Sequence, residues 1–176
     1  NSSAASDVYK RQKKSGLLTR VEKSLMMAGL TVKTLGGVQP NPTLSFARKG
    51  VLLALTFQAD FILAVGGGSV IDTAKAIAVG AANPHTDIWA YWTGKSAVQA
   101  ALPVGSVLTI SAAGSETSDS AVLTDDSRKD KRGLNTPFNR PRFALMNPEL
   151  TFTLSPKQLA CGVTDILMHT LDRYFT

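Results

Sequence analysis

Apolar residues along this chain recur with two different spacings, and the change between them predicts alternating helices and strands. Spacing of three or four residues predicts helices at 17–29, 43–58, 69–80 and from 155 or 156 to the C-terminus. Short apolar runs predict strands at 30–35, 60–65, 103–110 and 142–146. The runs at 60–65 and 103–110 are typical of strands buried on both faces of a parallel sheet. Thr43 is the expected N-cap of the second helix, and Met26 and Met27 are expected to fill the core.

A polar turn at 125–130 separates strand-like segments at 121–124 and 131–135, which predicts an antiparallel hairpin. Strands and helices alternate up to about residue 153, and only helical spacing follows from 154 to 176. The pattern therefore predicts an α/β domain, followed by the beginning of a second, helical domain.

Both ends of the chain differ from the rest. Residues 2–12 (SSAASDVYKRQ) look like the translation of a sequencing adapter, so we interpret 1–12 as a non-native tail and begin the domain at Lys13. A natural disordered tail is the alternative. The last residues, 170–176, keep helical spacing without a stop signal. We therefore expect the chain to be a fragment of a longer protein.

Charge and cysteine content exclude several classes of protein. The net charge is +6, but the basic residues gather in two separate stretches, 10–14 and 128–132, without interleaved aromatic residues. This favours a solvated surface over a nucleic-acid site. Cys161 is the only cysteine, which excludes an intrachain disulfide, and we expect it to be buried. There is no apolar run of about 18 residues and no signal-peptide pattern, so we expect a cytoplasmic protein without membrane contact.

A glycine-rich loop, Gly66–Ser69, connects a predicted strand to a predicted helix. Glycines let the backbone approach a phosphate, and the free N–H groups at the helix start point at the anion. The alternative is a tight turn without a ligand, because the full GxGxxG fingerprint is missing. Asp72 and Lys75, one turn into the helix, could reach a ligand or could be a helix-start acid and a solvated base.

Asp165 and His169 lie four residues apart, which places both on one face of the last helix. A carboxylate and an imidazole at this spacing can bind one divalent cation, such as Fe(II) or Zn(II). More often such residues form an exposed pair. The other histidine, His85, is expected at the surface.

Four segments together resemble one family. They are PNP at 40–42, FILAVGGGSVIDTAKAIA at 61–78, VLTISAAGSE at 107–116 and GVTDILMHT at 162–170. Their order and spacing are similar to those of iron-dependent alcohol dehydrogenases, especially the NADP-type butanol dehydrogenases and aldehyde reductases. The resemblance implies an α/β fold, with an incomplete Rossmann-like dinucleotide-binding domain at 13–153 followed by the start of an all-helical domain at 154–176.

The resemblance also implies a role for individual residues. Cofactor contacts are expected from Asn41, Gly67, Gly68, Ser69, Asp72, Thr109 and Lys131, with Lys131 on the nicotinamide side. Asp165 and His169 would be two of four metal ligands, and the other two, both histidines, would follow Thr176. Ala113 and Asn147 depart from the family pattern, which commonly has a threonine and an acid there.

The function implied by this resemblance is hydride transfer between NAD or NADP and a primary alcohol or aldehyde, assisted by Fe(II) or Zn(II). We expect the chain alone to have little turnover and the full-length protein to be a homo-oligomer. The sequence leaves two alternatives open. One is an enzyme like glycerol dehydrogenase or dehydroquinate synthase, and the other is a nucleotide-binding module without catalysis.

Overall fold

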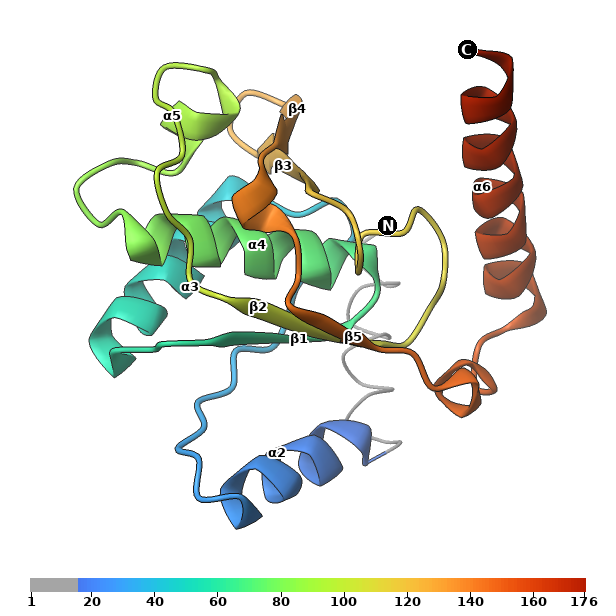
Figure 1. Cartoon of the computed structure of the whole chain (residues 1–176), viewed down its shortest axis with the longest axis horizontal. Coiled ribbons are helices and arrows are strands. Elements are labelled where there is room, and N and C mark those ends of the chain that lie inside the picture. The colour runs from blue at the N-terminus through green and yellow to red at the C-terminus, as the bar shows by residue number, and fades with distance from the viewer. Residues whose placement is uncertain (1–15) are drawn as a thin grey trace.

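A computed structural model of the chain describes residues 16–176 (Figure 1). The tail proposed at 1–12 lies outside the described residues. The helices are α2 (Leu17–Met27), α3 (Leu44–Phe57), α4 (Gly68–Ala82), α5 (Trp89–Trp92) and α6 (Pro156–Phe175), with short 3₁₀ turns η1 (Pro137–Asn139) and η2 (Pro148–Thr151). The strands are β1 (Ile62–Gly66), β2 (Val104–Leu108), β3 (Ser120–Asp125), β4 (Asp130–Asn135) and β5 (Phe143–Leu145).

Two sheets organise these elements. The strands β1, β2 and β5 form a parallel sheet in that order, with Gly66 at the end of β1 opposite Leu108 at the end of β2. The strands β3 and β4 form the predicted antiparallel hairpin. Because parallel strands end at the same edge, the loops that follow β1 and β2 start side by side. The α/β architecture predicted from the sequence is confirmed.

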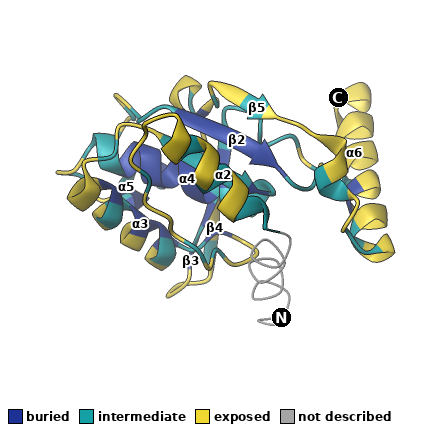
Figure 2. Ribbon diagram, turned by 90° about the horizontal axis from the view of Figure 1, so that it is seen from below, coloured by how far each residue is buried: buried dark blue, intermediate teal, exposed yellow. Residues whose placement is uncertain are grey.

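Helix α4 lies at the centre of the domain (Figures 1 and 2). One side packs on the sheet, where Ile71, Ala74 and Ala78 meet apolar residues of β1 and β2. The other side, with Ala76 and Val79, packs against α3, α5 and the hairpin. The small side chains of α4 allow elements to approach it from both sides, so every residue from Thr73 to Gly80 is buried.

Several predictions about burial and strands are wrong. Residues 30–35 form no strand, because no described strand pairs with them. Met27 is 78% exposed and Met26 58%, since α2 buries none of its residues against the domain. Strand β1 is only partly buried: Ala64 and Gly66 are buried, but its other three residues are partly exposed. Cys161 is exposed as well.

The start of α3 is capped from far away in the sequence. Thr43 occupies the N-cap position with an extended backbone, as predicted, but its side chain makes no capping hydrogen bond. Instead, Asp126 in the hairpin turn accepts a hydrogen bond from the backbone N–H of Ser45 at 3.1 Å. The hairpin therefore satisfies a helix-start donor that a local cap would otherwise bind.

Two glycines let α3 and α4 approach each other closely. A Cβ atom on Gly80 would lie 2.3 Å from Ile88 and 2.5 Å from Val51, and one on Gly50 would lie 2.2 Å from Ile77. We expect Gly80→Ala to lower the free energy of unfolding by about 1–3 kcal/mol, because overpacking outweighs the gain in helix propensity. Urea denaturation measures this change.

Gly133→Ala is the matched control, because a Cβ at Gly133 meets no atom within 4 Å. An equal stability for the Gly80 and Gly133 variants would contradict the close approach of the helices.

Candidate functional site

The glycine loop lies at the end of β1 and opens α4. Gly67 is the N-cap residue, and its carbonyl accepts hydrogen bonds from Val70 at 3.0 Å and Ile71 at 3.1 Å. A Cβ on Gly67 would lie 2.4 Å from the Ile110 side chain, so this position requires glycine. A Cβ on Gly68 would meet only Ser115, at 3.9 Å. The space around the Cα of Gly68 is therefore open except for Ser115.

The segment that follows β2 forms one wall of this open space. The backbone N–H of Thr109 donates to the carbonyl of Gly66 at 3.1 Å, which holds the end of β2 against the glycine loop. Ile110 packs on Gly67, and Ser115 lies beside Gly68. The predicted site residues Gly67, Gly68 and Thr109 are thus brought together.

Asp72 is engaged with the protein itself. One carboxylate oxygen accepts a hydrogen bond from the hydroxyl of Ser115, and the other accepts from the backbone N–H of Val122 at 3.0 Å. Burial raises the pKa of Asp72, while its hydrogen bonds and the nearby Lys75 and Lys131 lower it. Asp72 therefore connects α4 to the loop after β2 and to β3.

Lys75 is not a solvated base, so that alternative is wrong. Its side chain is completely buried. Its ammonium group donates to the carbonyls of Ser115 at 2.7 Å, Ser118 at 3.0 Å and Ser120 at 2.7 Å. Burial lowers the pKa of Lys75 to about 8. The tertiary fold supplies these partners, 40 to 45 residues away in the sequence.

Asn41 and Lys131 meet although they lie 90 positions apart in the sequence. The ammonium of Lys131 on β4 donates to the side-chain oxygen of Asn41 at 3.0 Å. The neighbouring Pro42 accepts a hydrogen bond from Thr124 at 2.8 Å, which holds this loop against the hairpin. Lys131 also acts electrostatically on Asp72, so these three predicted residues share one neighbourhood.

Asp165 and His169 converge on one face of α6. The distance from Nε2 of His169 to Oδ1 of Asp165 is 3.8 Å, and about half of each side chain is exposed. Helix α6 starts with a capping box formed by Ser155 and Gln158. No group of three or more metal-binding side chains occurs among residues 16–176. In distance and exposure, the pair alone resembles an ordinary ion pair at a protein surface.

A glycine contact connects α6 to the loop after β2. A Cβ on Gly162 would lie 2.7 Å from the carbonyl oxygen of Ser111, so the helix backbone passes directly over this residue. Ser111 follows Ile110, which packs on Gly67. The face with Asp165 begins one turn after this contact. Gly162 and Ser115 lie in the segments 162–170 and 107–116 that resemble the family, but no local pattern predicts the contacts that they make.

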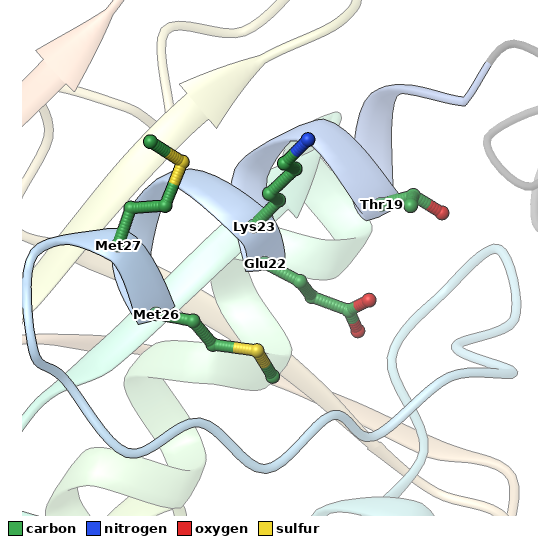
Figure 3. A pocket seen from close by; sticks show the side chains of 5 residues that line it. All are labelled: Thr19, Glu22, Lys23, Met26 and Met27. Carbon is green, nitrogen blue, oxygen red and sulfur yellow. The ribbon is translucent and has the colours of Figure 1, made fainter.

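A separate hollow of about 360 Å³ lies on α2 (Figure 3). It is lined by Thr19, Glu22, Lys23, Met26 and Met27. All five residues belong to one exposed helix, and none belongs to the glycine loop or α6. His85 is exposed, as predicted.

Comparison with known proteins identifies the family. The sequence model of the family "Iron-containing alcohol dehydrogenase" matches residues 5–148 of this chain. The chain belongs to this family. The "Probable NADH-dependent butanol dehydrogenase 1" of Bacillus subtilis is 43% identical over 163 residues, which cover 93% of this chain and 42% of that protein. The "NADPH-dependent aldehyde reductase YqhD" of Escherichia coli is 39% identical over 166 residues, covering 93% and 42% of the two chains.

Solved structures agree with this family assignment. The crystal structure of the NADH-dependent butanol dehydrogenase A of Thermotoga maritima superposes with a TM-score of 0.88 at 39% identity, covering 91% of this chain and 40% of that one. The chain therefore spans about 42% of the length of its curated relatives. The resemblance and the dinucleotide-binding fold inferred from the sequence are confirmed. The relatives named here include both NADH-dependent and NADPH-dependent enzymes.

The lowered pKa of Lys75 predicts a pH dependence of stability. Between pH 8 and the ordinary Lys pKa of 10.5, the folded protein holds Lys75 neutral while the unfolded chain binds a proton. Unfolding then takes up about one proton, so the contribution of Lys75 to the free energy of unfolding rises with pH across this window. Urea denaturation at several pH values measures the slope.

In Lys75→Met, the rise of the free energy of unfolding between pH 8 and 10.5 that is due to Lys75 should be absent. Proton uptake on unfolding of the unmutated chain at pH 9, followed with an indicator dye, gives a second readout. Unfolding without proton uptake would show that the pKa of Lys75 is not lowered.

Proposed function

We propose that this chain is the dinucleotide-binding part of a metal-dependent, NAD(P)-linked alcohol dehydrogenase or aldehyde reductase. The observation that carries the proposal is the glycine loop at the carboxyl end of a parallel strand. It opens α4 next to a gap at Gly68. Free helix-start N–H groups bind phosphate at such a point of an α/β sheet. The position of α6 beside the same edge supports a reaction site between the two parts.

The cofactor would lie along this edge. Gly67, Gly68 and Ser69 would hold the pyrophosphate through their backbone, and Thr109 would border it. Lys131, held by Asn41 at 3.0 Å, would face the nicotinamide side. Asp72 would act through Ser115, because both of its oxygens already accept hydrogen bonds from the protein.

The face of α6 fits two ligands of a divalent metal ion. Asp165 offers an oxygen and His169 a nitrogen, 3.8 Å apart and accessible, and this donor set suits Fe(II) or Zn(II). A metal ion bound there would polarise the alcohol or carbonyl oxygen of the substrate. The chain's own contribution would be to hold that face next to the loop after β2, through the contact of Gly162 with Ser111.

We propose residues 13–153 as the dinucleotide-binding domain and 154–176 as the beginning of a helical domain. Helix α6 stands apart from the α/β domain (Figure 1), and Gly162 is its only buried residue. No described helix is long and apolar enough to cross a membrane. A cytoplasmic homo-oligomer acting on a small alcohol or aldehyde is the proposed whole protein.

Gly68→Ala tests the phosphate site. The added methyl meets only Ser115, at 3.9 Å, so the fold should be unchanged while the methyl occupies the space that a phosphate needs. We expect NADPH binding, measured by titration with NMR detection, to weaken by about tenfold or more. Shifts of the Gly67–Ser69 amides in the unmutated chain should locate the cofactor.

The matched control is Gly133→Ala, which also adds a methyl in open space but lies on the hairpin. Equal NADPH affinity of the Gly68 and Gly133 variants would contradict the proposed phosphate site. No response of the unmutated chain to NADPH would contradict it as well.

The metal site is tested with cobalt(II). Two ligands bind a metal ion weakly, so we expect weak paramagnetic broadening centred on Asp165–His169 and little alcohol oxidation after addition of Fe(II) and NADP. His169→Ala should abolish the broadening, whereas His85→Ala, which changes the only other histidine, should not. Robust alcohol oxidation by the chain would contradict a site of two ligands.

A further inference from the structure

The segment between Ser115 and Ser120 lies directly beside the glycine loop but has little regular structure of its own. It consists of turns and bends until β3 begins at Ser120. Ser115 nevertheless borders Gly68 closely enough that an added Cβ would touch it at 3.9 Å. Some interaction outside the segment must therefore hold it in place.

The ammonium group of Lys75 supplies that interaction. It has three N–H donors, and three backbone carbonyls of the segment, at Ser115, Ser118 and Ser120, lie 2.7–3.0 Å from it. The hydroxyl oxygens of Ser115 and Ser118 lie farther away, at 3.4 and 3.3 Å, so the three carbonyls are the nearest acceptors. A buried carbonyl that lacks a hydrogen bond is costly, so these contacts stabilise the irregular segment.

Side chains of two other residues also contact the 115–120 segment. Asp72, one turn before Lys75 on α4, accepts a hydrogen bond from the hydroxyl of Ser115. Arg140, next to η1, donates to the carbonyl of Thr117 at 3.1 Å and forms an ion pair with Asp119 at 3.3 Å. Both contacts involve more accessible groups, whereas Lys75 is completely buried. The central anchor is therefore Lys75.

We infer that Lys75 is a positioning residue for dinucleotide binding: its ammonium fixes the 115–120 segment so that Ser115 forms the wall opposite Gly68. This inference rests on the proposed function of the glycine loop. Lys75 does not touch the cofactor. It lowers the cost of binding because the wall is ordered before the ligand arrives.

The first experiment measures amide hydrogen exchange of the chain without cofactor. In Lys75→Met, which keeps an unbranched side chain only one atom shorter but removes its donors, exchange at 115–120 should accelerate by about tenfold or more, while β1 and β2 stay protected. Lys75→Arg should restore part of the protection. Lys49→Met, on the exposed face of α3, is the matched control and should leave the segment unchanged.

The second experiment titrates NADPH into the same variants. We expect affinity to weaken about tenfold in Lys75→Met, to recover partly in Lys75→Arg and to stay unchanged in Lys49→Met. A segment that stays protected in Lys75→Met overturns the inference, as does an accelerated segment with unchanged NADPH affinity. If the unmutated chain fails to bind NADPH, the proposed function is wrong, and so is the link from Lys75 to NADPH binding. The amide hydrogen exchange of residues 115–120 still shows whether Lys75 holds this segment in place.

A third measurement needs no variant. In a chain with ¹⁵N-labelled lysine, the buried ammonium of Lys75 should give a slowly exchanging signal at neutral pH, with couplings across hydrogen bonds to the three carbonyls. Surface lysine ammonium groups exchange too fast to give such couplings. Absence of a protected ammonium signal would overturn the inference even if the Met variant did not fold.

Discussion

The burial of α4 on both sides is the constraint from which the rest of the structure follows. Its small residues pack on the sheet on one side and on α3, α5 and the hairpin on the other. Residues 73–80 in the middle of this helix are all buried, whereas its start, where the glycine loop lies, is partly exposed. The proposed phosphate site is therefore at one end of α4 and not in its fully buried middle.

The same burial explains the unusual environment of Asp72 and Lys75. Both leave α4 toward the loop after β2, and both find partners in its backbone and serine hydroxyls. A buried charge without partners would cost several kcal/mol, so these contacts compensate for burial in addition to ordering the loop. In the binding role proposed for the glycine loop, Asp72 and Lys75 would shape the wall beside the phosphate without touching it.

Helix α6 has a different relation to the domain. Its contact with the loop after β2 depends on a glycine, because the backbone of α6 passes so close to Ser111 that no side chain fits. Most of its apolar residues are exposed in the described structure (Figure 2). Exposure of this extent is typical of a surface that packs against further protein. The relatives of this chain are more than twice as long.

The sequence by itself determined the local features of this protein. The spacing of apolar residues placed the main helices, the strands around the glycine loop and the hairpin, because periodicity reflects which face of an element is buried. The four-residue spacing of Asp165 and His169 placed both on one face of a helix. The quoted segments also led to the correct family.

Only the tertiary structure decided which distant residues meet. It gave Lys75 its three carbonyl partners, used Asp126 instead of Thr43 to cap α3, and left Met26, Met27 and Cys161 exposed. It also left 30–35 without a strand, since a strand requires a neighbour. These outcomes depend on contacts between residues far apart in the chain, and local residue patterns carry no information about such contacts.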